Sequence, residues 1–204
     1  MITETIKGIS LLFETSADCF SPQHVDPGTL AMLSCVEFKA EDKVLDLGCG
    51  YGVVGILAAK FTRPQHVFLT DISGQAVRCA RQNAVLNHVS GVNIIISDAY
   101  ENLNETGFSL ILSNPPYHTD FSVAKTFIEK GFNRLLIGGR FYMVTKRREW
   151  YKNKFISIFG GVKIHQIDDY YVFEAEKRTE SYAIAAYRKG KDHGRKNSGG
   201  AGTI

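Results

Sequence analysis

One apolar stretch of the chain closes on a loop of glycines: Val44-Leu45-Asp46-Leu47-Gly48-Cys49-Gly50-Tyr51-Gly52-Val53-Val54-Gly55. A short apolar run bounded by glycines predicts a β-strand over Lys43–Leu47, and the segment Val53–Phe61, rich in Ala, Leu and Ile, predicts a helix after the loop. Strand and helix patterns alternate along the rest of the chain. Repeated βα units predict an α/β fold with a mostly parallel, doubly wound sheet.

Five further strands are predicted over His66–Thr70, Val92–Ile96, Phe108–Leu112, Gly139–Thr145 and Val162–Ile167. The predicted helices run from Pro27, with Asp26 as N-cap, to about Val36, from Ser73 as N-cap to about Asn87, over Phe121–Leu136, and from about Arg147 to Phe159. The Gly138-Gly139 pair is expected to break the chain before the strand that follows. Tyr171–Ala175 and Tyr182–Tyr187 both have strand patterns, and either one can be the last strand of the sheet. This β-rich end predicts an antiparallel hairpin at one edge.

Composition predicts one soluble domain, since the 204 residues are 44% hydrophobic and 22% charged. We expect this domain to span 1–188, with 1–40 as an entry or lid segment and 189–204 as a basic, Gly-rich disordered tail. The net charge of +3 belongs to the end of the chain, because the residues from Arg188 onward sum to +4 and the rest to −1. No apolar run has the 18 residues of a membrane span, and Met1-Ile2-Thr3-Glu4 does not begin a secretory signal. A cytoplasmic protein is expected.

The cysteines Cys19, Cys35, Cys49 and Cys79 are scattered and form no CxxC pair. This spacing argues against a disulfide framework and against a zinc site. We therefore expect buried thiols in a reducing compartment and no metal.

Polar residues stand at the ends of four consecutive predicted strands. The glycine loop follows the first strand, Asp71 the second, Asp98 the third and Asn114 the fourth. Because doubly wound sheets bind ligands outside the carboxyl ends of their strands, these residues are expected to share one rim.

The glycine loop also matches a dinucleotide-binding pattern, since Gly50, Gly52 and Gly55 spell GxGxxG and Asp71 lies 21 residues after Gly50. Asp46 distinguishes a loop that binds a dinucleotide from a loop that binds a cationic ligand. A carboxylate just before the loop repels a pyrophosphate but favours a ligand that carries an ammonium and a sulfonium. Glycines are needed in both cases for close approach of the backbone.

The segment Asn114-Pro115-Pro116-Tyr117 ends the fourth strand. Two adjacent prolines remove two backbone donors, so neither a helix nor a strand ladder continues there. What remains is an amide side chain, carbonyl groups and an aromatic face, which together suit a planar substrate with an NH₂ group. The alternative is a strand terminator followed by a surface loop.

The glycine loop, Asp71, Asp98 and Asn114-Pro115-Pro116-Tyr117 together resemble the class I S-adenosylmethionine-dependent methyltransferases that modify planar nitrogen, with a Rossmann-like, seven-stranded sheet. More narrowly, the chain resembles the "methyltransferase small" group, which contains the small-subunit ribosomal RNA guanine-N2 methyltransferases. Phe20 with Asp26-Pro27-Gly28-Thr29 is similar to that group's entry segment, and Ser113–His118 is similar to its catalytic loop. Gly138 through Gly160 resembles its later strand and helix. The resemblance covers roughly residues 10–176.

The resemblance implies that the glycine loop holds the methionine part of S-adenosylmethionine. Gly48, Gly50 and Gly52 would pass beneath it, and Asp46 would order the loop or meet the ammonium group. Cys49 lies within this loop, where we interpret it as a small buried filler and not as a nucleophile.

The resemblance also assigns the remaining cofactor contacts. Asp71 would accept hydrogen bonds from the ribose hydroxyls and Asp98 one from the adenine amine, with Ile72 and Ala99 against the ring. The alternative for each acid is a helix N-cap or a turn residue at a strand end.

An exocyclic aromatic amine is a poor nucleophile, because its lone pair is delocalised into the ring. If the Asn114 side chain and the Pro115 carbonyl each accept one N–H, the nitrogen is held toward tetrahedral geometry, and alignment supplies most of the rate. Pro116 completes the rigid segment and Tyr117 is placed to stack on the base. His118 either accepts the released proton or makes an ordinary hydrogen bond.

The expected substrate is the exocyclic N2 amine of guanine in small-subunit (16S) ribosomal RNA, either naked or in a ribosomal subunit. Phe20 and His118, with Arg147 and Arg148 in the basic segment Lys146–Lys154, are candidate substrate-binding residues. The alternatives are glutamine-amide methylation of a protein, adenine N6 methylation, a small-molecule methyltransferase, and a non-catalytic module that keeps the fold. The sequence leaves the oligomeric state open.

Overall fold

The computed structural model describes residues 1–15, 21, 23–116 and 121–183. Its strands are β1 (Ile2–Ile6), β2 (Ile9–Phe13), β3 (Val44–Leu47), β4 (Val67–Asp71), β5 (Asn93–Ile96), β6 (Phe108–Ser113), β7 (Leu135–Thr145), β8 (Lys163–Ile167) and β9 (Tyr170–Glu176). Its helices are α1 (Pro27–Cys35), α2 (Val53–Ala58), α3 (Gly74–Leu86), α4 (Ser122–Arg134) and α5 (Glu149–Phe159), with a short 3-10 helix at Pro64–His66.

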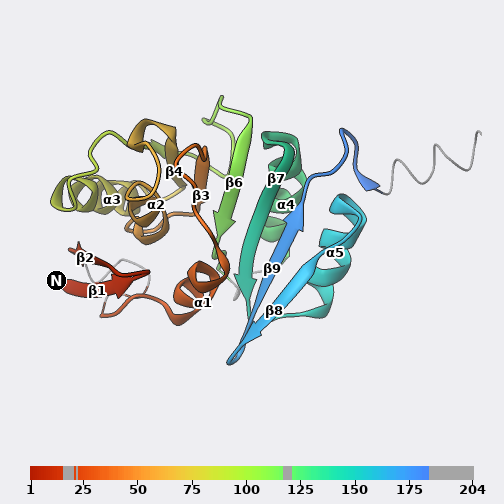
Figure 1. Ribbon diagram of the computed structural model, residues 1–204, viewed down its shortest axis with the longest axis horizontal. Coiled ribbons are helices and arrows are strands. Elements are labelled where there is room, and N and C mark those ends of the chain that lie inside the picture. The colour runs from red at the N-terminus through yellow and green to blue at the C-terminus, as the bar shows by residue number, and fades with distance from the viewer. Residues whose placement is uncertain (16–20, 22, 117–120, 184–204) are drawn as a thin grey trace, which may run out of the picture.

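Seven strands form the main sheet in the order β5-β4-β3-β6-β7-β9-β8 (Figure 1). The pairs from β5 to β7 are parallel, whereas β9 runs antiparallel to both β7 and β8. The sequence-based prediction of a mostly parallel sheet with an antiparallel hairpin at one edge is therefore confirmed.

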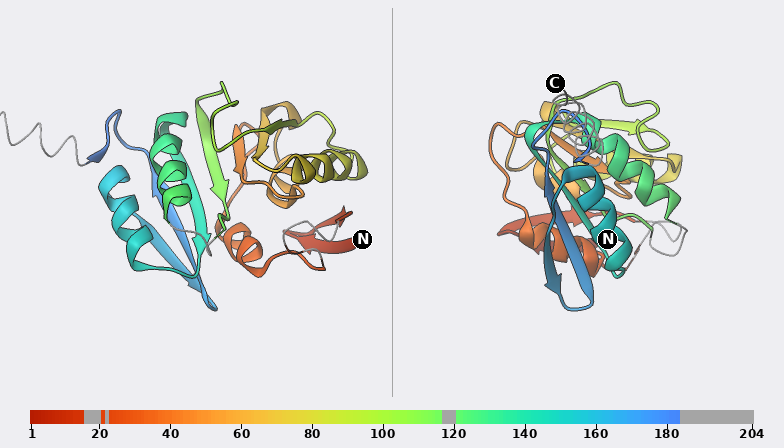
Figure 2. Two further views of the ribbon diagram at one scale, coloured as in Figure 1. Left: turned by 180° about the vertical axis from the view of Figure 1, so that it is seen from behind. Right: turned by 90° about the vertical axis from the view of Figure 1, so that its right-hand side faces the viewer.

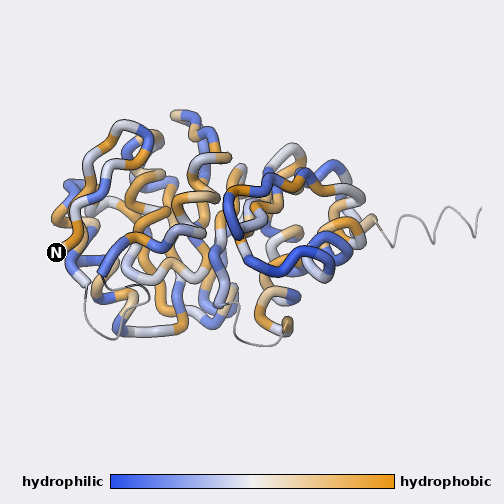
Figure 3. Tube along the Cα trace, turned by 90° about the horizontal axis from the view of Figure 1, so that it is seen from below, coloured by the Kyte–Doolittle hydropathy of each residue, from blue (hydrophilic) through white to orange (hydrophobic). Residues whose placement is uncertain are grey.

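Helices cover both faces of the sheet, as the two views in Figure 2 show. Side chains of α1, α2 and α3 pack with Leu110 and Leu112 on one face, and those of α4 and α5 pack with Ile111 on the other. Successive residues of β6 thus enter opposite cores, which is the period-2 alternation of a strand buried on both sides. Hydrophobic and hydrophilic stretches alternate along the chain accordingly (Figure 3).

The helix starts follow the predicted caps. The Asp26 side chain accepts a hydrogen bond from the Thr29 amide, with Pro27 as the first helical residue of α1. The Ser73 side chain does the same for Ala76 at the start of α3. Both helices begin at the carboxyl end of the sheet or beside it, so the caps lie near the rim that carries the predicted site.

Two predicted boundaries were wrong. β7 begins at Leu135 and passes through Gly138-Gly139 without a break, with an irregular register against β6 between Phe108 and Leu110. Glycine is required there because a Cβ on Gly139 would lie 2.7 Å from the Phe108 carbonyl oxygen. α2 ends at Ala58 and turns occupy the residues up to 62. β9 is the last strand of the described chain, and 184–187 lie outside the described residues.

A two-stranded antiparallel sheet at the N-terminus, β1 with β2, was not predicted. Its two-residue turn, Lys7-Gly8, has positive φ at both positions (52° and 77°), which is the geometry of the tightest hairpins. Two asparagines, Asn83 in α3 and Asn87 at its C-cap, hold the second strand and the residue that follows it. Asn87 pairs with both main-chain groups of Leu12, and Asn83 pairs with both of Glu14. Asn83 also donates to the Tyr51 carbonyl at 3.0 Å, which joins this hairpin to the glycine loop.

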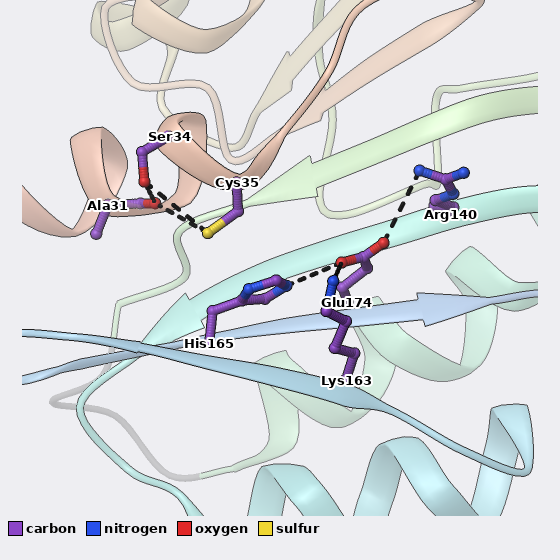
Figure 4. A network of polar contacts seen from close by, with 7 residues as sticks. All are labelled: Ala31, Ser34, Cys35, Arg140, Lys163, His165 and Glu174. Carbon is purple, nitrogen blue, oxygen red and sulfur yellow. Dashed lines mark hydrogen bonds and ion pairs between the residues drawn. The ribbon is translucent and has the colours of Figure 1, made fainter.

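A polar network lies on the sheet face of β7, β9 and β8, beside the end of α1 (Figure 4). The Glu174 carboxylate is 2.9 Å from His165 Nε2, 3.7 Å from Lys163 Nζ and 3.8 Å from an Arg140 nitrogen. Burial would raise the pKa of Glu174, but hydrogen bonds from His165 and Tyr142 and the charge of Lys163 lower it overall. These groups satisfy one another, and the network lies apart from the predicted site.

Candidate functional site

A cavity of about 330 Å³ opens where β3, β4, β5 and β6 end. This is the ligand position of doubly wound sheets. It is lined by Asp26, Thr29, Asp46, Leu47, Gly48, Cys49, Gly50, Tyr51, Val53, Val54, Thr70, Asp71, Ile72, Ser97, Asp98, Ala99, Asn114, Pro116, Val123 and Phe127. The glycine loop, the strand-end acids Asp71 and Asp98, and Asn114 therefore share one rim, as predicted.

The glycine loop presents bare backbone to this cavity. Gly48 and Gly50 have φ of 76° and 55°, a left-handed conformation that favours glycine. The amides of Gly48 and Cys49 donate to the Thr70 carbonyl, which anchors the loop on β4. No heavy atom lies within 4 Å of a Cβ built on Gly50, so a ligand can approach the backbone closely there.

Asp46 is buried beneath the loop, where its Oδ2 accepts a hydrogen bond from the Gly55 amide at 2.8 Å. Burial raises the pKa of its carboxyl to about 7; the Gly55 hydrogen bond opposes this and the charge of Asp71 adds to it. Gly55 itself has to be glycine, because a Cβ there would lie 2.4 Å from Leu69. Asp46 thus orders the loop, and its carboxyl group ionises near neutral pH.

Asp71 is fixed by two main-chain donors, since Oδ2 accepts from the Gly50 amide at 2.9 Å and Oδ1 from the Ser73 amide at 2.8 Å. A carboxylate has about four acceptor positions, so two remain for hydroxyl groups of a ligand. Asp98 follows β5 with an exposed side chain. Ile72, an apolar residue that is 67% exposed, lies beside Asp71 on the cavity wall, with buried Ala99 also lining it. An apolar surface between two acids suits a purine nucleoside.

Asn114 ends β6 with a defined amide orientation. Its Nδ2 donates to Asp26 Oδ2 at 2.7 Å and to Thr29 Oγ1 at 3.0 Å. Its Oδ1 is buried and has no hydrogen-bond partner in the described structure. Within that same part of the chain, Thr70 Oγ1 is the other buried side-chain atom of this kind, and Thr70 also lines the cavity. Unsatisfied buried acceptors are rare, and these two are available to accept from a ligand group or a water in the cavity.

Two predicted site residues, Gly52 and Pro115, do not line the cavity. Gly52 precedes α2 with φ of 98°, and a Cβ there would lie 3.0 Å from Ile56, so its conformation and packing account for the glycine. Pro115 lies between Asn114 and Pro116, which both line the cavity. Phe20, Tyr117 and His118 lie outside the described residues.

The two predicted substrate-binding arginines lie away from the cavity wall. The guanidinium of Arg147 stands over the Phe121 ring, 5.1 Å from its centroid, and Phe121 stacks on Trp150 at 4.3 Å. Arg148 pairs with Glu149 at 2.6 Å. Arg147 therefore lies next to the first residue described after the segment 117–120, whereas Arg148 belongs to the start of α5.

The Cys49 thiol is buried, and its pKa is raised well above the ordinary value by burial and by the charges of Asp46 and Asp71. A thiol with a raised pKa is a poor nucleophile. The loop cysteine is thus a small buried side chain, as the sequence analysis interpreted it. In the described part of the chain no three His, Cys, Asp or Glu side chains are grouped to hold a metal ion.

Sequence reasoning missed the roles of Asp26, Thr29 and Thr70 in this cavity. Asp26 was recognised as a helix cap, but its contact with Asn114 spans 88 residues, which a local pattern does not reveal. Thr70 precedes the strand-end Asp71, and this neighbourhood was the available signal.

The cavity fits S-adenosylmethionine by the chemistry of its walls: bare loop backbone at Gly50, a carboxylate at Asp46 for a cationic ligand, and acids at Asp71 and Asp98 beside apolar Ile72. A doubly wound sheet with an antiparallel edge hairpin and this rim define a class I methyltransferase. The chain belongs to the methyltransferase small domain family, whose model matches residues 10–174.

Named relatives agree with this assignment. The chain is similar to the 16S rRNA guanine-N2 methyltransferase RsmC of T. thermophilus, solved with AdoMet and guanosine, with 27% identity and a TM-score of 0.80 over 87% of this chain and 50% of that one. It is 34% identical to ribosomal RNA small subunit methyltransferase C of Mannheimia succiniciproducens, over 71% of this chain and 44% of the relative. It is 29% identical to the uncharacterized protein YbxB of Bacillus subtilis, over 81% and 85% of the two chains. The chain thus spans half or less of the length of these two named methyltransferases.

No helix in the described residues is long and apolar enough to cross a membrane.

Proposed function

We propose that this protein transfers a methyl group from S-adenosylmethionine to the exocyclic N2 amine of guanine in small-subunit (16S) ribosomal RNA. The observation that carries the proposal is the Asn114 amide: its NH₂ group is occupied by Asp26 and Thr29, and its buried oxygen has no partner among the described residues. An acceptor held in this way at the wall of the cofactor cavity is suited to bind an NH₂ group.

The chain's own groups prepare the amine for reaction. Asn114 Oδ1 and the Pro115 carbonyl each accept one N–H of the substrate amine. The prolines at 115 and 116 carry no backbone N–H that competes for these oxygens. Drawing both N–H bonds toward carbonyl oxygens holds the nitrogen toward tetrahedral geometry, so its lone pair is less delocalised into the ring and is available for bonding to the methyl group. Positive charge that develops on nitrogen is stabilised by the same dipoles. When bound, S-adenosylmethionine would supply an electrophilic methyl group and become S-adenosylhomocysteine. The methylated nitrogen would lose one proton to solvent, and alignment would account for most of the rate.

We assign the cofactor to the glycine-loop side of the cavity. Gly48, Gly50 and Cys49 would form its floor at the methionine end, with Asp46 as the nearby charge. Asp71 would accept from the ribose hydroxyls and Asp98 from the adenine amine, with Ile72 and Ala99 against the purine. The geometry of Asp71 supports its part, because two main-chain donors already aim its carboxylate.

Guanine in ribosomal RNA is favoured over the other planar amines by the relatives. The RsmC structure named above contains both AdoMet and guanosine, and the chain matches that structure with a TM-score of 0.80. The Asn-Pro-Pro-Tyr segment by itself also fits a glutamine amide or adenine N6, so the product decides between them. Arg147, which stands over the Phe121 ring, and Arg148, at the start of α5, would contact RNA phosphates outside the cavity. The substrate would be naked RNA or a ribosomal subunit in the cytoplasm.

Nucleoside mass spectrometry of small-subunit ribosomal RNA from a strain that lacks the gene tests this proposal. We expect the loss of one N2-methylguanosine and its return when the gene is restored. An unchanged nucleoside profile would contradict the ribosomal RNA assignment. Loss of N6-methyladenine, or of methylglutamine in digested proteins, would identify the alternative substrate.

A further inference from the structure

Asp26 joins two parts of the fold that are distant in the sequence. Its Oδ2 accepts from the Thr29 amide at 2.9 Å as the N-cap of α1, and from Asn114 Nδ2 at 2.7 Å. Both Asp26 and Thr29 are buried and line the cavity. The helix cap is therefore also part of the wall that surrounds Asn114.

The chemistry of these groups fixes the orientation of the Asn114 amide. A carboxylate only accepts hydrogen bonds, so the group that faces Asp26 must be the NH₂ group of Asn114. Thr29 Oγ1 accepts from the same nitrogen at 3.0 Å. With both N–H bonds taken, the amide oxygen has to point the other way. If the amide were turned by 180°, its oxygen would face the Asp26 carboxylate, and two acceptors would repel each other.

We infer that Asp26 and Thr29 are positioning residues, which orient the Asn114 amide so that its oxygen faces the substrate amine. This inference rests on the proposed role of Asn114, but it does not depend on which amine is methylated. Asp26 also acts through charge. A hydrogen bond from the amide to a carboxylate is charge-assisted, and it polarises the amide so that Oδ1 becomes a stronger acceptor.

Close packing around Asp26 supports the inference. A Cβ on Gly28 would lie 2.9 Å from Asp26 Oδ2 and 2.7 Å from the Tyr170 ring. The first turn of α1 is thus held between Asp26 and the start of β9. Such packing leaves the carboxylate little freedom, and a positioning group has to be rigid because a small misplacement of a reacting atom is costly.

Four substitutions separate positioning from helix capping. Asp26→Ser keeps a good N-cap for α1 but loses the carboxylate that Asn114 contacts. Asp26→Asn keeps one oxygen that can accept from both partners and removes the charge. Thr29→Val removes the hydroxyl and keeps the shape, and Thr29→Ser restores it.

The effects are measured as kcat and KM on the substrate that the wild-type protein methylates. Asp26→Ser is expected to lower kcat about 100-fold, as expected for a misplaced reacting group. The kcat of Asp26→Asn should lie between the kcat of Asp26→Ser and that of the wild type. Thr29→Val should lower kcat about fivefold, as expected for the loss of one neutral hydrogen bond, and Thr29→Ser should recover most of that kcat. The dissociation constant for S-adenosylhomocysteine should change less than threefold in all four.

Asp42 provides the matched control. It is a buried aspartate at the opposite end of β3, where it accepts from the Lys39 amide and from Ser109 Oγ, each at 2.7 Å. Asp42→Ser removes comparable hydrogen bonds and should lower the melting temperature while leaving kcat unchanged. Equal kcat losses in Asp42→Ser and Asp26→Ser, or a wild-type kcat in Asp26→Ser, would overturn the inference.

A readout without turnover separates this inference from the proposed substrate. The side-chain amide resonances of Asn114, assigned by NMR, should shift and exchange faster with water in Asp26→Ser, whichever substrate is correct. Unchanged Asn114 resonances would show that Asp26 does not hold the amide. A changed amide without any methylation of ribosomal RNA by the wild type would instead place the error in the proposed function.

Discussion

The Gly55 amide donates a hydrogen bond to Asp46 Oδ2 across the glycine loop, with a nitrogen–oxygen distance of 2.8 Å. This contact ties the end of β3 to the first turn of α2, so the loop between them has a fixed path. It also places a carboxylate with a pKa raised to about 7, mainly by burial, at the wall of a cavity that we assign to a cationic cofactor.

The first prediction concerns the pH dependence of cofactor binding. The raised pKa means that Asp46 is largely protonated below pH 7, whereas a cationic ligand favours its ionised form, so binding releases a proton. Affinity for S-adenosylmethionine should therefore rise about tenfold from about pH 6 to about pH 8 through this group, given the pKa of about 7. Asp46→Asn should lack this component. Calorimetric titration of both proteins checks it, and parallel pH profiles would contradict it.

The second prediction compares the two strand-end acids. Each carboxylate oxygen of Asp71 accepts from a different main-chain amide, and Asp71→Asn replaces one of these oxygens with an NH₂ group. It should therefore weaken S-adenosylmethionine binding at least tenfold and lower stability by about 1–2 kcal/mol. Asp98→Asn should weaken binding and leave stability within about 0.5 kcal/mol, because the Asp98 side chain is exposed. Calorimetry with denaturant unfolding separates the two effects. Full affinity in Asp71→Asn would show that the ribose site is misplaced.

The third prediction concerns the N-terminal hairpin. Asn83→Ala should destabilise the protein by about 2–3 kcal/mol, because the amide and the carbonyl of Glu14 and the carbonyl of Tyr51 each lose a hydrogen-bond partner. It should also weaken S-adenosylmethionine binding, since Tyr51 belongs to the glycine loop. Asn87 contacts β2 and its own helix, so Asn87→Ala serves as the control. This variant should have lower stability and normal S-adenosylmethionine binding. Equal affinity in both variants would mean that the hairpin and the loop are independent.

The fourth prediction concerns acid stability. Because the pKa of Glu174 is lowered in the folded protein, its contribution is present above its unfolded-state pKa of about 4.3 and is lost as the pH falls below that value. Glu174→Gln should lower the free energy of unfolding by about 1 kcal/mol at pH 7 and by progressively less as the pH falls below about 4. Glu176→Gln, whose partner Arg178 is mostly exposed, should change little at either pH. A pH-independent loss in Glu174→Gln would refute the electrostatic explanation.

Local patterns in the sequence were sufficient for most of the sheet. β3, β4, β5 and β6 were predicted within a residue or two because each is a short apolar run that ends at a glycine loop, an acid or the prolines after Asn114. The Gly138-Gly139 pair misled because glycine marks breaks in most sequences, whereas here it permits close approach of β7 to β6. The N-terminal hairpin was missed because its support comes from Asn83 and Asn87, which lie about 70 residues later.

The site residues also fall into those that the sequence could predict and those that it could not. Gly48, Asp71, Asp98 and Asn114 could be predicted because strand order alone brings strand ends to one rim. The partners that orient Asn114 could not, because its contact with Asp26 depends on how α1 packs against the end of β6. The pKa of Asp46 likewise follows from burial in the folded protein and not from its neighbours in the sequence.

The most direct test of the central claim compares wild type with Asn114→Ala on unmethylated small-subunit ribosomal RNA and on small subunits that contain it. The nucleosides are identified by mass spectrometry after incubation with S-adenosylmethionine, whose binding to both proteins is measured separately. We predict N2-methylguanosine with the wild type and at least about 100-fold less with Asn114→Ala, while the variant still binds the cofactor. Equal methylation by the two proteins, or a wild-type product other than N2-methylguanosine, would contradict the account.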